Sequence, residues 1–396
     1  EEPDLDGDQV GFKGFDYLEK NMPRFSKDLA STMLQMKGMK ATHNGFRTLK
    51  KYVSGAVTLR EAQNSMRQAR LEASLQEEAE QREAIQLLEE IVEKSPVFRS
   101  VPERLRKKLI PKELTNCTPL PEGSIVFLYD GVQDHLLGKS TSEEFKERNP
   151  SLSHKVVAYD IKQSRAQDIH GRLYQQLLVS ALLGRVSVLI TGPNCRTWSI
   201  LLNRVIEGKS PPVRERSDPW NYAGPEKSEF WTNWLDKESL LFLKPMLILM
   251  VCKCVDIYGN NPVGFLVEHP EDPEKSPEKK RDWLKLSECK TSNPSVWATE
   301  FMVELQRFLE GEFQHFDQGP LGHFAKKSTT VFTNLQVSLN GIRGKGSLPV
   351  QESVGSDKLS RWAPDFRTIV IEGIQRHLGI RQAIKDMSEF PQNASM

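Results

Sequence analysis

The sequence predicts an α/β protein with a doubly wound, mostly parallel sheet, preceded by an N-terminal helical segment. Short apolar runs rich in β-branched residues alternate with helical patterns after residue 123. The clearest run, 186–190, is short enough for a buried strand and is broken by Gly192. Polar residues follow several of these runs, and ligands of such sheets bind beyond the carboxyl ends of the strands. We therefore expect the functional site at that edge.

The composition is that of a globular, intracellular protein. The 396 residues are 38% hydrophobic, and 54 Lys and Arg balance 53 Asp and Glu, so no global basic field indicates nucleic acid. The five cysteines lack the paired spacing of a zinc site, which favours a reducing compartment and no metal centre. The most apolar region, 240–255, contains Lys244, Pro245 and Lys253 and is expected to be a core helix rather than a membrane span.

Residues 1–115 are expected to be helical. One helix is predicted over 26–37, and a longer one begins at the capping box Thr58-x-x-Glu61 and runs to Lys94. The longer helix is either an oligomerisation arm or a helix that packs one face on the body of the protein. The second interpretation is favoured because no heptad pattern is sustained.

From residue 123 to about 380 the pattern predicts one α/β domain, followed by a polar tail at 381–396. The region 201–262 is expected to hold an insertion and a helix, and 271–335 a target-recognition or accessory part. The predicted strands are 125–129, 155–161, 186–190, 263–267, 312–317 and 329–335, and the predicted helices are 141–148, 173–182, 240–258, 293–310 and 365–378.

Two residues at predicted strand ends have side chains suited to catalysis. Cys195 follows a buried strand and has Arg196 beside it, so its thiolate could act as a nucleophile. Glu268 ends another apolar strand, where burial would favour its protonated form and a role as proton donor. A structural cysteine and a loop-capping glutamate are the alternative interpretations.

These two segments resemble motifs of the cytosine-5 DNA methyltransferases. Residues 192–199, Gly-Pro-Asn-Cys-Arg-Thr-Trp-Ser, are similar to that family's Gly-Pro-Pro-Cys-x-x-x-Ser loop, and Val-Glu-His-Pro at 267–270 is similar to its Glu-Asn-Val or Glu-Asn-Pro strand end. The order of motifs is also similar, and the resemblance covers about 124–380. It implies a Rossmann-like methyltransferase fold of the divergent type associated with retroelements.

The resemblance implies a reaction and a set of site residues. Cys195 would attack carbon 6 of a flipped-out cytosine, Glu268 would bind and protonate the ring at nitrogen 3, and S-adenosylmethionine would methylate carbon 5. The partner would be DNA, or RNA, and the location the nucleus. The residues expected at the cofactor are Tyr129, Asp130, Gly131, Asp160, Asp168 and Pro193, and those expected at the substrate are Arg196, Ser199, Lys326 and Lys327.

Several positions depart from the family pattern. The loop after the first strand has one glycine where the family has two, Asn194 replaces a proline, and His269 replaces an asparagine. No Gln-x-Arg-x-Arg strand occurs, and 326–330 (Lys-Lys-Ser-Thr-Thr) lies at about its place. These departures leave a second hypothesis: an inactive methyltransferase-like module that binds nucleic acid or protein within a mobile-element polyprotein. A third is that the N-terminal helices assemble a complex.

Overall fold

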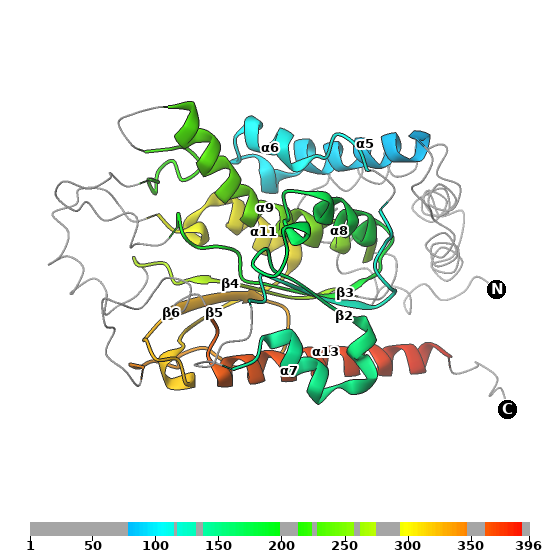
Figure 1. The fold of residues 1–396 in the computed structure, drawn as a ribbon, viewed down its shortest axis with the longest axis vertical. Helices are drawn as coiled ribbons and strands as arrows, with labels where there is room; N and C mark the ends of the chain where they lie inside the picture. Colours follow the sequence, from blue (N-terminus) through cyan, green and yellow to red (C-terminus); the bar gives the residue numbers. More distant parts are fainter. Residues whose placement is uncertain are drawn as a thin grey trace, which may run out of the picture.

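The computed structural model describes residues 78–114, 117–131, 138–198, 213–223, 228–256, 262–274, 294–346 and 361–389. These residues form a six-stranded sheet with helices on both faces (Figure 1). The strands are β1 (Ser124–Leu128), β2 (Val156–Tyr159), β3 (Val186–Thr191), β4 (Gly264–Pro270), β5 (Glu312–Asp317) and β6 (Ser328–Thr333). The α-helices are α5 (Glu78–Lys94), α6 (Glu103–Leu109), α7 (Thr141–Arg148), α8 (Arg172–Leu182), α9 (Glu229–Asp256), α11 (Glu300–Leu309) and α13 (Pro364–Glu389).

The strand order is β2-β1-β3-β4-β6-β5. The pairs β1–β2, β1–β3 and β3–β4 are parallel, whereas β6 is antiparallel to β4 and to β5. This order confirms the predicted class, an α/β protein with a mostly parallel sheet, compatible with a Rossmann-like arrangement. Since β2 and β3 lie on opposite sides of β1, the strand order reverses at β1 and β3, which is where open sheets of this kind form a ligand crevice.

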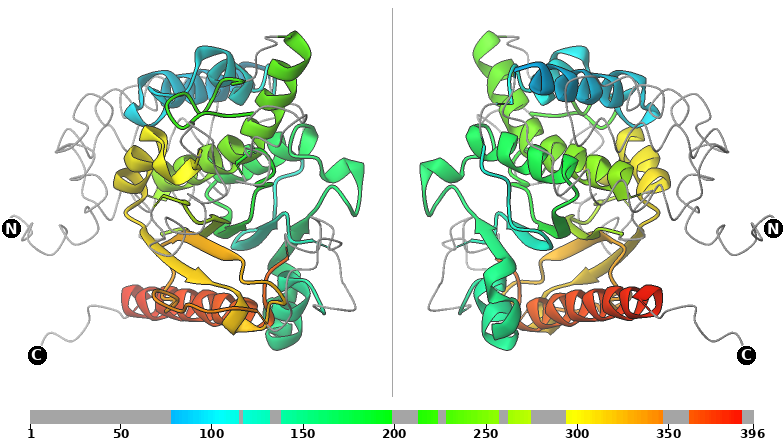
Figure 2. Two further views of the ribbon diagram at one scale, coloured as in Figure 1. Left: turned by 90° about the vertical axis from the view of Figure 1, so that its left-hand side faces the viewer. Right: turned by 90° about the vertical axis from the view of Figure 1, so that its right-hand side faces the viewer.

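Alternate residues of the central strands enter two separate cores. In β1, Val126 and Leu128 belong to the core beneath α5, α6, α8, α9 and α11, whereas Ile125 and Phe127 belong to the core beneath α7 and α13. Figure 2 shows the same two layers from the sides. A strand buried on both faces reads as a continuous apolar run, which explains why β1 and β3 were recognisable in the sequence.

The described part of the N-terminal segment packs on the body of the protein. Leu88 in α5 and Leu105 in α6 are fully buried and share one core with α9 and α11. The buried Asp236 of α9 pairs with two cations of α6, Arg104 at 3.1 Å and Lys108 at 2.7 Å. This agrees with the interpretation of a helix packed by one face. The predicted helix at 26–37 and the first part of the one at 58–94 lie outside the described residues.

The structure corrects several element boundaries. Helix α9 begins at Glu229 rather than near 240, so Trp231 and Trp234, which precede the predicted helix, lie within it. Helix α11 begins at Glu300, because the Thr299 side chain caps it by accepting from the Met302 amide, and it ends with Glu310 in the left-handed conformation. Strand β4 continues to Pro270, because β6 pairs with it there, so Glu268 lies within the strand.

Among the described residues, no helix combines the length and the apolar character that crossing a membrane requires.

Helix α13 is longer than predicted, extending from Pro364 to Glu389. Strands β5 and β6, which fall in the region 271–335, form one edge of the central sheet.

Candidate functional site

Three predicted site segments meet at the carboxyl edge of the sheet. Tyr129–Gly131 follow β1, Asp160 follows β2, and Gly192–Arg196 follow β3. The parallel pairing of these strands brings their ends to one edge. Pro193 in the third segment is buried, and Asn194 and Arg196 are exposed.

Asp160 links the ends of β2 and β1. Its carboxylate accepts hydrogen bonds from the backbone amides of Gly131, at 2.9 Å, and Lys162, at 2.7 Å. Gly131 has a φ of +79°, and a Cβ placed on it would meet no heavy atom within 4 Å. Asp160 thus holds the Gly131 amide and Gln163 donates to the Gly131 carbonyl oxygen at 3.0 Å, while the space beside the Gly131 Cα is open among the described residues.

Asp130 holds the start of α7. Its carboxylate accepts from the Ser142 amide at 3.2 Å and from the Ser142 hydroxyl at 2.5 Å. Burial raises the pKa of Asp130, and the hydrogen bonds from Ser142 and Ser140 oppose that rise. Ser140 and Glu143 complete a capping box at the same helix end. The structure thus gives this predicted cofactor residue a local capping contact.

Tyr129 and Asp168 lie at the side of this edge that faces α9. Tyr129 has a φ of +61°, and its hydroxyl donates to the Leu241 carbonyl oxygen at 2.8 Å. Asp168 is half-buried, and its carboxylate accepts from the His170 amide at 2.8 Å. Ile161, directly after Asp160, is 52% exposed and offers an apolar surface that the sequence analysis missed, because a single apolar residue after a strand carries no pattern.

The second half of the edge joins β3 and β4. A Cβ on Gly192 would lie 3.3 Å from Glu268 Oε2 and 3.3 Å from the Trp362 ring. Glu268 therefore lies against the loop that carries Cys195, three positions after Gly192. It is 6% exposed and lies on the face of β4 opposite to His269. The structure brings the two predicted catalytic segments together.

Lys327 also reaches this pair. Its ammonium group is 3.6 Å from Glu268 Oε1 and donates to the Arg361 carbonyl oxygen at 2.7 Å. Gln318 is fully buried and approaches Glu268 Oε1 at 3.4 Å through its amide nitrogen. Lys326, which precedes Lys327 in the sequence, pairs instead with Asp317 at 3.6 Å. Of the two predicted lysines, Lys327 is the one placed at the Cys195–Glu268 pair.

The electrostatic surroundings keep the Cys195 thiol protonated. Burial raises its pKa to about 11, and the Glu268 carboxylate adds to the rise. The ammonium group of Lys327 acts in the opposite direction. Removal of the negative charge at Glu268 would therefore favour the thiolate, so the protonation states of the two side chains are electrostatically coupled.

A buried arginine supports the residues that follow Cys195. The guanidinium of Arg214 donates to Thr197 Oγ1 at 2.8 and 3.1 Å and to the Pro219 carbonyl oxygen at 2.5 Å, and it lies 3.9 Å from the centre of the Trp198 ring. A further bond of 3.0 Å reaches Ser239 in α9. Burial lowers the pKa of Arg214 to about 9. Arg214 thereby ties the Cys195 loop to α9.

His269 lies on the other face of β4, in an aromatic enclosure. The rings of Phe242, Trp297 and Trp198 surround it at centroid distances of 5.8, 6.0 and 6.5 Å. Burial lowers its pKa to about 3, with a smaller effect from Arg214, so it is neutral at physiological pH. This residue, which departs from the family motif, is a packing residue behind the site.

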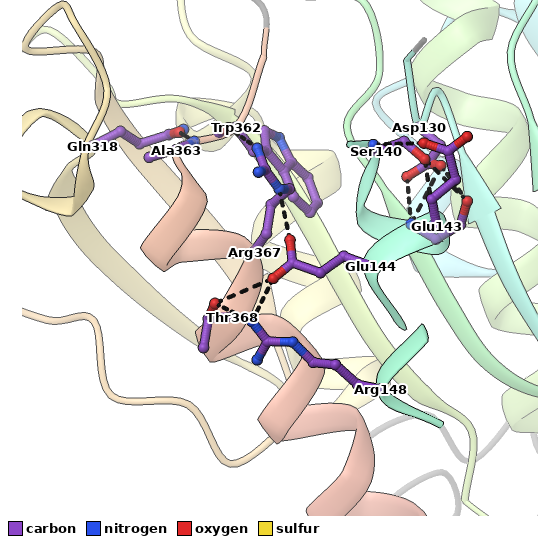
Figure 3. A network of polar contacts seen from close by, with 11 residues as sticks. Asp130, Ser140, Glu143, Glu144, Arg148, Gln318, Trp362, Ala363, Arg367 and Thr368 are labelled. Atoms are coloured by element: carbon purple, nitrogen blue, oxygen red, sulfur yellow. Dashed lines mark hydrogen bonds and ion pairs between the residues drawn. The ribbon is translucent and has the colours of Figure 1, made fainter. Parts of the chain in front are cut away.

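Trp362 and Gln318 are site residues that the sequence analysis did not identify. Gln318 Oε1 accepts from the Ala363 amide at 2.8 Å, and Arg367 of α13 donates to the Trp362 carbonyl oxygen at 2.9 Å (Figure 3). Arg367 also pairs with Glu144 of α7 at 3.1 Å. No local motif marks these residues, because Gln318 reaches Glu268 from the turn between β5 and β6, and Trp362, just before α13, lies beside Gly192 only through packing.

The remaining predicted residues are placed as follows. Arg196 lies over the ring of Trp234, 5.5 Å from its centre, and Ser199 lies outside the described residues. Within the described ranges, no cluster of three or more His, Cys, Asp or Glu side chains is arranged to hold a metal ion. Comparison with protein-family models and with curated proteins finds no match to this chain.

Proposed function

We propose that this protein transfers a methyl group to carbon 5 of cytosine in DNA, with Cys195 as nucleophile and Glu268 as acid. The observation that carries the proposal is the meeting of the Cys195 loop, Glu268 and Lys327 at one strand edge. A thiol, a carboxyl group and a cation are the groups that addition to a pyrimidine ring requires. The sulfur bonds to the ring, an acid neutralises the charge that develops, and a cation stabilises it.

The coupling between Glu268 and Cys195 supports a substrate-dependent activation. With Glu268 charged, the thiol has a pKa of about 11 and stays protonated at neutral pH. When Glu268 is protonated to donate a hydrogen bond to ring nitrogen 3, its repulsion of the thiolate disappears. On attack the thiol would lose its proton to solvent and its sulfur would bond to carbon 6, while the ring nitrogen would accept the proton from Glu268, so that protons and charge are balanced. Methyl transfer to carbon 5 and loss of the proton there would release the sulfur again.

The residues at β1 and β2 fit S-adenosylmethionine, which would supply the methyl group. Gly131 leaves space beside its Cα for a ligand, and Ile161 offers an exposed apolar surface for a planar ring. Asp160 keeps lone pairs beyond the two that its backbone bonds use, and these could accept from ribose hydroxyls. Asp130 does not contribute to this fit, because its carboxylate caps α7.

The experiment that tests the proposal is transfer of tritium from labelled S-adenosylmethionine to cytosine-containing duplex DNA. We expect the parent protein to label DNA and the Cys195→Ala variant to lose all labelling. Cys117→Ala is the matched control. It also removes one cysteine thiol, but this half-buried cysteine lies beside Gln175 of α8 rather than beside Glu268. Labelling of RNA in place of DNA would change the substrate but keep the reaction, whereas no labelling of either would refute it.

A second candidate function is nucleic-acid or protein binding without catalysis, within a mobile-element polyprotein. It is favoured by the use of the Asp130 carboxylate in capping and by the high pKa of the Cys195 thiol. Isothermal titration calorimetry with S-adenosylmethionine separates the two. Micromolar or tighter binding supports the enzyme, and the absence of binding together with the absence of labelling supports the inactive module.

A further inference from the structure

Aromatic rings extend outward from the Cys195 loop along the first turns of α9. Trp234 lies beneath the guanidinium of Arg196 and contacts Trp231 edge to face, with centroids 5.7 Å apart. Trp231 stacks on Tyr222 at 5.7 Å with an interplanar angle of 7° and contacts Phe230 at 5.1 Å. We call Tyr222, Phe230, Trp231 and Trp234 the aromatic row.

The aromatic row is not part of either core. Phe230 is 69% exposed, and the other three side chains are half-buried. Neither core includes any of the four. In Figures 1 and 2 the first turns of α9 lie at the outer side of the helical layer, level with α6 and distant from the sheet. Four adjoining aromatic side chains outside the core are typical of a binding surface rather than of a packing face.

The charges around the aromatic row suit an anionic partner. Asp236 is buried and paired with Arg104 and Lys108. Burial raises the pKa of Glu238, and the nearby Arg196 and Arg214 only partly oppose that rise. Arg196 and Lys237 are exposed. Glu229, at the far end of the row, is an exposed carboxylate, and so is Asp218 near Tyr222. The cations thus lie at the end of the row that adjoins Cys195.

We propose that the aromatic row binds unpaired nucleotides of the nucleic-acid strand whose target base enters the Cys195 site, an inference that rests on the proposed function. Extrusion of a base interrupts stacking in the strand, and aromatic rings can replace that stacking for the neighbouring bases. Arg196 lies between the row and Cys195, where it can stack on a base or contact a phosphate. Proline-rich peptides also dock on aromatic surfaces, but the continuity of this row with the nucleophile loop favours the strand.

The test is binding of a fluorescein-labelled twelve-nucleotide oligothymidine to the full chain, followed by anisotropy. This probe contains no cytosine, so binding is measured apart from methyl transfer. We expect Phe230→Ala to weaken binding about tenfold, in line with the loss of one stacked base, and Trp231→Ala to weaken it at least as much. Phe230→Ala should leave the urea unfolding curve unchanged, since that side chain is mostly exposed.

Two controls separate stacking from charge and from fold. Val303→Ala changes another exposed apolar residue, on α11, and should bind the probe as the parent does. An abasic strand of equal length keeps the phosphates but lacks the bases. The parent should bind this strand more weakly than the oligothymidine, and the Phe230→Ala variant should bind it with the same affinity as the parent.

The outcomes also separate this inference from the proposed function. Loss of oligothymidine binding in Phe230→Ala, with no methyl transfer by the parent, would leave the aromatic row as a nucleic-acid surface and refute only the enzyme. Methyl transfer by the parent together with unchanged probe binding in Phe230→Ala would refute the row. Equal binding of the abasic strand, or binding of a polyproline peptide in place of the oligonucleotide, would also overturn it.

Discussion

At the ends of β1 and β2 the carboxylates bind nearby backbone and serine groups, whereas at the ends of β3 and β4 the charged side chains face one another. Asp130 and Asp160 accept from Ser142, Gly131 and Lys162. Glu268, in contrast, meets Lys327, which is distant from it in sequence. Polar groups satisfied by local backbone stabilise loops, and charges held against one another by the fold can be coupled for chemistry.

The largest expected effect comes from Arg214, which supports the loop of the second region. Arg214→Met leaves Thr197 Oγ1, Ser239 Oγ and the Pro219 carbonyl oxygen without this donor in a buried environment. We expect the free energy of unfolding to fall by about 3 kcal/mol or more. Urea denaturation at pH 7 measures it. Arg214→Lys keeps the charge but donates from one nitrogen in place of three, so its stability should lie between those of the parent and the Met variant. A Met variant as stable as the parent would contradict this role.

A smaller loss of stability is expected from Asp130, in the first region. Asp130→Ala removes the acceptor for the Ser142 amide and hydroxyl at the start of α7, which should cost about 1–2 kcal/mol. Thermal unfolding measures the change, and Asp130→Asn, which keeps one acceptor oxygen, is the control and should lose less. If the Ala variant kept full stability but bound S-adenosylmethionine more weakly, Asp130 would be a cofactor residue and the contrast between the two regions would fail.

The smallest expected change in free energy concerns the titration of the Cys195 thiol, which tests the chemistry of the second region directly. Alkylation by iodoacetamide requires the thiolate, so its rate at Cys195 should rise with pH to a midpoint near 11. Glu268→Gln removes a negative charge and should move the midpoint down, whereas Lys327→Met removes a positive charge and should move it up. Mass spectrometry of the Cys195 peptide follows the reaction.

The matched control for this titration is Glu312→Gln, which removes an exposed carboxylate at the start of β5. Its midpoint should equal that of the parent. Equal midpoints for Glu268→Gln and the parent would show that the carboxylate and the thiol are independent, and would remove the basis for substrate-dependent activation.

The fold class and the main strands could be predicted from sequence because their signals are local. The apolar runs at β1 and β3 and the stripe of α8 reflect burial on both faces of a sheet and on one face of a helix. The start of α9 was predicted too late, since Phe230, Trp231 and Trp234 do not form a stripe against the core and resemble an irregular segment. A local sequence pattern reveals a helix through the residues that the helix buries, and the first turns of α9 are only partly buried.

The sequence by itself determined the main strands and the positions of Cys195 and Glu268 after apolar runs. Only the tertiary structure decided their surroundings: the reversed strand β6 brings Lys327 to Glu268, and α13 brings Trp362 to Gly192. The physical reason is that strand and helix signals depend on neighbours a few residues away. The charge around a thiol depends instead on groups that meet through packing, whatever their distance along the chain.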